Sequence, residues 1–193
     1  GTSGGYGIYS YYGNYYNRTS SDSVLIYNNV IRCHSTATPG YTKYGTYMYR
    51  NYNFDYKFNS HEMASSYTYS INLYMYYGYY GRVRNNVFQN IGGTTYWKRY
   101  GSGVAQDYNG YWRGTAGASG AQGFTLGTNS YITIPRYKDP AVGNLRPNSA
   151  QLDSSAQANT NVAVDVLGVT RNLTHPDRKS TRLNQSRGHL VCR

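Results

Sequence analysis

The acidic side chains are the first place to look for chemistry, and they are few and scattered. Elimination on an acidic polysaccharide needs clustered carboxylates to hold Ca²⁺ and a base to take the proton. Hydrolysis of a glycosidic bond needs two carboxylates within several ångströms of each other. Neither spacing occurs among the eight acids: Asp22, Asp55, Glu62, Asp107, Asp139, Asp153, Asp165 and Asp177. We therefore predict no catalytic residue in this chain.

Histidine and cysteine show no metal-ligand or nucleophile pattern either. His61 and Glu62 lack the second His of a zinc protease motif. His34 and His175 stand alone, without ligand spacing. Cys33 has no motif around it, and such a Cys is more often structural than reactive. We expect no metal site and no cofactor.

Tyrosine is the residue type whose abundance points to a surface rather than a reaction. The chain holds 26 Tyr and 22 Gly among 193 residues, and only 14% of its residues are charged. Tyr, Thr and Val favour strands, and Gly, Asn and Ser punctuate the short strand-like stretches. No helical apolar stripe of useful length is present. The composition and pattern predict an all-β fold.

Two sequence motifs alternate along the first 112 residues. The first, VLIYNNVI at 24–31, returns at 81–88 and more weakly at 55–60. The second, YGIYSY at 6–11, returns at 44–49 and more loosely at 72–76. Two strand motifs that repeat in order are typical of a solenoid, in which each coil buries its inner face only by stacking on the next. We predict a right-handed parallel β-helix in preference to a β-sandwich.

Asparagine closes each copy of the first motif. Asn tolerates left-handed backbone conformations and can turn the chain sharply. If coils stack in register, equivalent Asn amides can hydrogen-bond to one another along the axis, as buried polar groups require. We therefore predict structural turns at Asn28, Asn29, Asn59, Asn85 and Asn86.

The register of the middle copy stays open. A strict alignment on the Asn positions places Lys57 inside the coil, whereas a slip of one residue places Tyr56 and Phe58 there. The sequence does not decide between these two alternatives.

Alternation sorts the second motif into an inner and an outer face. The inner positions, which are small or apolar, are Ile8, Ser10, Thr46, Met48, Leu73 and Met75. The tyrosines between them would form two outward columns, one of Tyr9, Tyr47 and Tyr74 and one of Tyr11, Tyr49 and Tyr76. Neighbouring strands lie about 4.8 Å apart, so these rings can pack offset against one another. Aromatic faces suit sugar rings, so the columns are candidate glycan-binding residues. The alternative is that they only cover the strands.

Several segments resemble a known family. VRNNVFQN at 83–90 resembles the coil motif of right-handed β-helix proteins of the pectate-lyase-like superfamily, and DYNGY at 107–111 resembles a segment that follows their last long coils. Residues 139–140, 149–153, 165–171 and 176–177 resemble the closing segment of bacterial surface β-helix proteins. The resemblance implies this fold, export, and a C-terminal piece of a longer protein. It does not imply one activity.

The basic tail changes the meaning of the net charge of +11. DRKSTRLN at 177–184 and LVCR at 190–193 resemble a translated sequencing adapter, so we expect residues 178–193 to be a non-native, disordered tail. Without its five Lys and Arg the net charge falls to +6, which removes the argument for nucleic-acid binding. Cys33 is then the only cysteine, and no disulfide is expected. Residues 1–112 would be β-helix coils, and residues 113–177 a Gly-rich loop and closing segment.

Two functions remain as expectations. The first is a non-catalytic segment of an extracellular or cell-surface protein that contacts a polysaccharide or mediates adhesion through its Tyr columns. The alternative is the C-terminal coils of a polysaccharide lyase or glycoside hydrolase whose active site lies in upstream coils. The longest apolar runs are a few residues, so we expect no transmembrane segment. We also expect a monomer.

Overall fold

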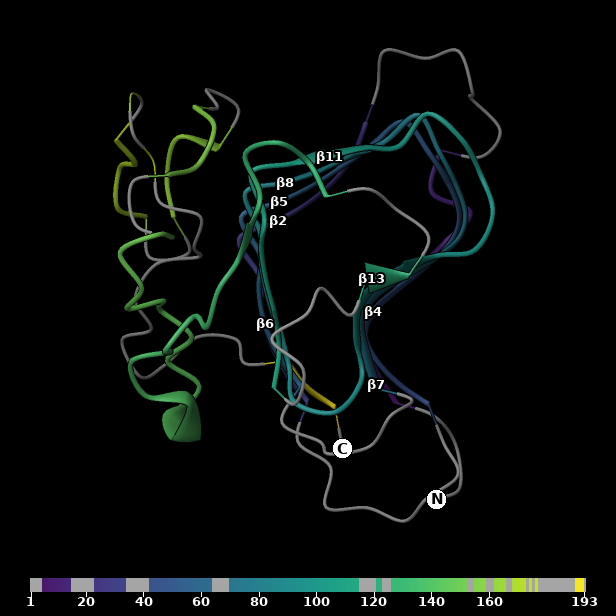
Figure 1. Ribbon diagram of the computed structural model, residues 1–193. Helices are drawn as coiled ribbons and strands as arrows, with labels where there is room; N and C mark the ends of the chain where they lie inside the picture. The colour runs from purple at the N-terminus through teal and green to yellow at the C-terminus, as the bar shows by residue number, and fades with distance from the viewer. Residues whose placement is uncertain are drawn as a thin grey trace.

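The computed structural model describes residues 5–14, 23–33, 42–63, 70–114, 121–122, 126–152, 155–158, 162–165, 168–172, 174, 176 and 190–192. These residues form an all-β structure with one short 3-10 helix, η1 (Pro140–Val142). The strands build three sheets whose neighbouring strands run parallel (Figure 1). The predicted all-β class is confirmed.

The chain visits the three sheets in rotation. Sheet A contains β1 (Tyr6–Tyr11), β4 (Lys43–Tyr52), β7 (Ser70–Tyr79), β10 (Thr94–Lys98) and β13 (Ala121–Gln122). Sheet B contains β2 (Val24–Tyr27), β5 (Phe54–Lys57), β8 (Arg82–Arg84) and β11 (Ala105–Asp107). Sheet C contains β3 (Val30–Cys33), β6 (Ser60–Met63), β9 (Val87–Asn90), β12 (Gly110–Arg113), β14 (Tyr131–Ile132) and β15 (Leu190–Cys192). The Tyr-Gly motif builds sheet A, and the Asn motif builds sheets B and C.

The core lies between the three sheets, and register-matched residues supply it. Thr46 and Met48 of β4 align with Leu73 and Met75 of β7, and all four are 1% exposed or less. This is the inner face that the alternation predicts. Ile8 and Ser10 of β1 align with the same columns but are only half-buried. The main apolar cluster is completed by Phe54, Tyr56, Val83, Phe88, Tyr96 and Tyr111.

In the middle Asn motif the inner residue is Tyr56, as the one-residue slip predicts, and not Lys57. Tyr56 aligns with Ile26 and Val83, and its ring is fully buried in the core. Phe58 does not join that core, because it occupies the turn with φ of +55°. Lys57 is on the outer face, yet its side chain is also buried, against Asp55 at 3.1 Å. The register is set by Asn59, which aligns with the second Asn of each neighbouring pair.

A ladder of asparagines connects the successive turns between sheets B and C. Asn59 donates from its backbone N and its Nδ2 to Oδ1 of Asn86, at 2.9 and 3.0 Å. Asn29 makes the same two bonds to Asn59, and Asn86 makes them to Asn109. The predicted amide bonding along the axis is therefore present. Asn109 extends it by a rung that the Asn-Asn pattern missed.

The residue before each ladder Asn points the other way. Asn28, Phe58, Asn85 and Tyr108 all have φ between +55° and +60°, the left-handed region that Asn enters more easily than most residues. The side chain of Asn85 leaves the turn outward, where its Oδ1 accepts from the Gln157 backbone N at 2.8 Å and its Nδ2 donates to the Gln157 O at 2.9 Å. The first Asn of a pair thus contacts the C-terminal segment, and the second forms the ladder. The sequence did not predict this difference.

The described part of the C-terminal segment packs along these outward residues and over sheet C. Tyr137, Leu145 and Leu152 bury Val30 and Val87, and the Tyr137 hydroxyl donates to the His61 backbone O at 2.8 Å. Figure 1 shows the segment beside β6, on the side away from β4 and β7. The described residues of the segment therefore cover the outer face of sheet C and not that of sheet A.

The end of the chain differs from the expected disordered tail. Residues 190–192 form β15, which pairs with β3 and sets the backbone of Cys192 in register with Cys33. Cys33 is disulfide-bonded, so the expectation of a lone thiol is wrong. The edge of β3 offers unpaired backbone groups, which a strand of any origin can satisfy. Residues 178–189 and 193 lie outside the described residues.

Replacing Asn85 with Gly tests the outward role of the turn residue. Gly accepts the positive φ, so the change removes only the two bonds to Gln157. We expect a loss of about 1 kcal/mol in the free energy of unfolding. We also expect faster amide exchange at residues 155–158, measured by hydrogen exchange with mass spectrometry. Unchanged exchange there would contradict the proposed attachment.

Candidate functional site

The outward side chains of sheet A and of the bend after it form a continuous aromatic surface, here called the tyrosine face. Its register places Tyr9, Tyr47 and Tyr74 in one row and Tyr11, Tyr49 and Tyr76 in another. The ring centroids along the first row are 5.5 and 5.0 Å apart, and those along the second are 5.1 and 5.5 Å apart. In-register parallel strands thus keep the phenol rings in contact.

The two rows are not equally exposed. Tyr9 and Tyr11 on the edge strand β1 are 52% and 58% exposed, whereas Tyr74 is only 6% exposed. Tyr74 does not point freely into solvent as the alternation suggests, because Tyr47 packs against its ring and Arg99 hydrogen-bonds its hydroxyl. The accessible part of the rows therefore lies toward β1.

Further tyrosines widen the face beyond the two rows. The rings of Tyr6 and Tyr44 stack at 5.4 Å in a third column. At the bend, Tyr77 and Tyr100 stack at 5.0 Å, and Tyr12 meets Tyr11 at 4.3 Å. Tyr6 and Tyr44 occupy equivalent positions in the sequence motif, so their pairing could have been read from it. The bend residues carry no comparable signal.

Two arginines lie on the tyrosine face. The guanidinium carbon of Arg50 is 5.4 Å from the ring centroids of Tyr12, Tyr49 and Tyr77, and its Nη1 donates to the Tyr12 hydroxyl at 3.0 Å. Arg99 lies 5.5 Å from the rings of Tyr76 and Tyr100. These are cation–π distances. They add positive charge and hydrogen-bond donors to the phenol rings of the face.

The pKa values of two phenols of the face, those of Tyr47 and Tyr11, are raised. Burial raises the pKa of Tyr47 well above its ordinary value, and the neighbouring Tyr74 and Tyr44 raise it further. A hydrogen bond with Tyr12 is the first cause that raises the pKa of Tyr11. These two hydroxyls keep their protons and can both donate and accept a hydrogen bond.

A small hollow lies where the face bends. It has a volume of about 170 Å³ and is lined by Arg50, Tyr52, Tyr77 and Tyr79. The rings of Tyr52 and Tyr79 stack at 4.6 Å on its wall. It continues the aromatic surface toward the start of sheet B.

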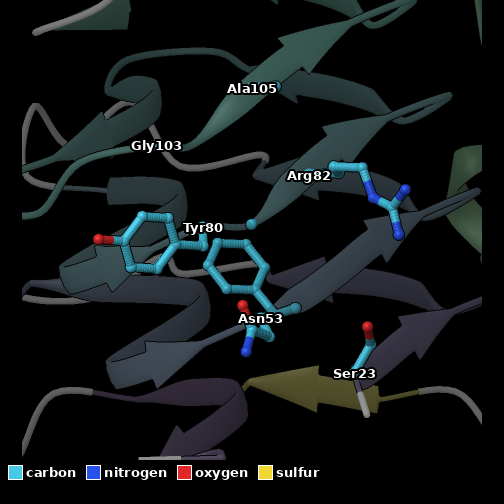
Figure 2. A pocket seen from close by; sticks show the side chains of 8 residues that line it. Ser23, Asn53, Tyr80, Arg82, Gly103 and Ala105 are labelled. Atoms are coloured by element: carbon cyan, nitrogen blue, oxygen red, sulfur yellow. The ribbon is translucent and has the colours of Figure 1, made fainter. Parts of the chain in front are cut away.

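A larger pocket follows at the corner between sheets A and B (Figure 2). It has a volume of about 350 Å³ and is lined by Ser23, Asn53, Phe54, Tyr80, Gly81, Arg82, Gly103 and Ala105. The Tyr80 ring is 60% exposed and lies over Gly103, where a Cβ would come within 2.7 Å of the ring. The pocket thus combines an aromatic wall with a guanidinium, an amide and a hydroxyl. This volume is at the lower end of small-ligand sites.

The charged side chains of sheet B are mostly engaged with one another. Asp55 accepts from Arg82 at 2.8 Å and from Lys57 at 3.1 Å, and Arg84 lies 3.7 Å away. Burial lowers the pKa of Lys57, although Asp55 opposes this. On sheet C, Arg32 pairs with Glu62 at 3.0 Å. Asp55 and Glu62 therefore neutralise the Lys and Arg side chains beside them.

Within the described ranges, no three His, Cys, Asp or Glu side chains gather in a way that could hold a metal ion. The same ranges contain no helix of the length and apolarity needed to cross a membrane. Comparisons with known protein families, curated proteins and solved structures find no match for this chain.

Proposed function

We propose that this chain is a section of a right-handed parallel β-helix of an extracellular surface protein, similar to the pectate-lyase-like superfamily. The ordered rotation through three parallel sheets and the four-rung Asn ladder support this proposal. Crossover connections between parallel strands of one sheet are right-handed in nearly all proteins, which supports the handedness.

The proposed function is non-catalytic binding of an extended polysaccharide along the tyrosine face, in contact with a substrate surface or another cell. The observation that carries it is the pair of in-register Tyr rows on the sheet that the described part of the C-terminal segment leaves uncovered. Sugar rings present flat C–H faces that pack on aromatic rings, while their hydroxyls need donors and acceptors. The Tyr rings and hydroxyls, flanked by Arg50 and Arg99, supply both.

The bend hollow and the corner pocket extend the proposed path. Tyr76, Tyr77, Tyr79 and Tyr80 follow one another along β7 and the turn after it, and each borders the face, the hollow or the pocket. A glycan chain that crosses the rows from Tyr11 to Tyr76 and then follows the end of β7 would therefore meet aromatic surface until it reaches the corner pocket. A sugar unit there would stack on Tyr80 within reach of Asn53 and Ser23.

Binding to a panel of soluble and insoluble polysaccharides tests the proposal. For any glycan that binds, we expect the Tyr9→Ala/Tyr11→Ala variant to bind about tenfold more weakly, because two ring contacts are lost. Both side chains are more than half exposed, so the variant should fold normally. Affinity is measured by isothermal titration or by depletion from solution.

The matched control is Tyr27→Ala/Tyr131→Ala. These tyrosines are 43% and 41% exposed and belong to sheets B and C. The control should bind within about twofold of the wild type. Equal losses of affinity in the two variants would refute the tyrosine face as the site. If the protein binds no polysaccharide of the panel, glycan binding itself is refuted.

A further inference from the structure

The exposed edge of the tyrosine face holds phenol rings at contact distance on neighbouring strands. Tyr11 of β1 and Tyr49 of β4 are in register, with ring centroids 5.1 Å apart and ring planes 12° from parallel. Tyr11 is 58% exposed, the most of the residues in the two rows. Because the residues are in register and the rings nearly parallel, equivalent ring carbons face each other across the strand gap.

We propose that the tyrosine face is a site of oxidative cross-linking, at which a one-electron oxidant of the peroxidase class, acting with hydrogen peroxide, joins Tyr11 to Tyr49. The resulting bond ties β1 covalently to β4. No sugar takes part in this reaction, so the inference stands apart from the proposed glycan binding.

The reaction balances without any further component. Each phenol gives up one electron and one proton and becomes a phenoxyl radical. The two radicals couple through the ring carbons next to the oxygen, and the hydrogens on those carbons move to the oxygens. The product has lost two hydrogen atoms in total. One hydrogen peroxide accepts the two electrons and two protons and leaves as two waters.

The surrounding rings favour radical formation at this pair. Tyr9 lies 5.9 Å from Tyr11, Tyr12 lies 4.3 Å from it, and Tyr76 lies 5.5 Å from Tyr49. An electron vacancy formed on any of these rings can pass to its neighbour over such distances. A radical formed elsewhere on the face can therefore reach Tyr11 or Tyr49. Tyr11 is both exposed to the oxidant and in contact with a partner ring.

The second row offers a weaker version of the same geometry. Tyr9 and Tyr47 are 5.5 Å apart with ring planes at 29°, and Tyr9 is 52% exposed. The larger separation and tilt place equivalent carbons less directly opposite each other. We therefore expect Tyr11–Tyr49 as the main product and Tyr9–Tyr47 as a minor one.

Treatment of the full chain with a peroxidase and limiting hydrogen peroxide tests the inference. The expected result is dityrosine fluorescence from the monomer band and a linked Tyr11–Tyr49 peptide pair lighter by two hydrogens. Its yield should not change on tenfold dilution of the protein, because the two partners belong to one molecule. Peptide mass spectrometry locates the link.

Tyr49→Phe keeps the ring stack but removes one phenol, and it should abolish that peptide pair. Tyr27 is the internal control, since it is 43% exposed but its in-register neighbour on β5 is Lys57. Tyr27 should give no link within the monomer. The inference is overturned if links within the monomer persist at the same yield in Tyr49→Phe, if they involve Tyr27 as often, or if cross-linking occurs only between molecules.

Discussion

Replacing Asn86 with Ala is expected to lower the free energy of unfolding by about 4 kcal/mol. The Asn86 amide is fully buried and makes five side-chain hydrogen bonds, to Asn59, Tyr56, Arg84 and Asn109. Ala leaves the Asn59 backbone N and the Tyr56 carbonyl without this partner. Each buried group orphaned in this way costs about 1–3 kcal/mol.

Urea denaturation followed by circular dichroism measures this loss. Asn86→Asp is the sharper variant, because it keeps an acceptor for Asn59 but turns a donor toward the Tyr56 carbonyl into a second acceptor. It should destabilise at least as much as Ala. The exposed Asn148, outside the ladder, is the control, and its change to Ala should cost less than about 0.5 kcal/mol. Similar losses at positions 86 and 148 would show that the ladder contributes little.

Acidification from pH 7.5 to pH 5 is expected to cost the fold about 2 kcal/mol through one residue, His61. Its ring is fully buried, and burial lowers its pKa from 6.5 to about 3. The unfolded state therefore takes up the proton first. The stabilising contribution is complete above pH 6.5, and it falls by about 1.4 kcal/mol per pH unit until pH approaches 3.

The surroundings of His61 explain why the proton is excluded. Its Nε2 hydrogen-bonds the Tyr56 hydroxyl, which also contacts the Thr46 hydroxyl at 2.8 Å. Its Nδ1 has no hydrogen-bond partner among the described residues and faces Gly45, where a Cβ would come within 2.7 Å of it. A second N–H on the ring would have no acceptor there.

The measurement is the free energy of unfolding in urea at pH 5, 6 and 7.5, for the wild type and for His61→Gln. The variant lacks the titrating group, so its loss over this range should be smaller by about 2 kcal/mol. Other histidines and carboxylates act equally in both proteins and cancel in the comparison. Parallel pH profiles would rule out His61 as the cause.

The sequence predicted the features that repeat. Alternation was enough to place Met48 and Met75 inside and to align Tyr11 with Tyr49, because the side-chain period of a strand is fixed. The Asn-Asn pattern predicted the ladder at Asn29 and Asn86, because equivalent residues of stacked repeats lie side by side. Asn109 was missed because Tyr108 replaces the first Asn of the pair, although the backbone there is equally left-handed.

Features that depend on contacts between residues of different repeats could not be predicted. Tyr74 follows the outward pattern but is buried by Tyr47 of β4 and by Arg99, which follows β10, the strand on the other side of β7. The side chain of Lys57 is buried because Asp55 pairs with it. Arg50 has no motif, and only the bend after it brings its guanidinium over three rings. Such contacts are set by distant residues and not by local periodicity.

The outward residues of the B–C turns have a consequence for how the chain assembles. The C-terminal segment meets them in reverse order, with Gln157 at Asn85, Val162 at Phe58 and Val164 at Asn28. Each contact lies one strand spacing, about 4.8 Å, from the next. Loss or doubling of one three-strand repeat would shift every later contact out of reach. The segment can therefore make all of these contacts only with a stack that has the correct number of turns.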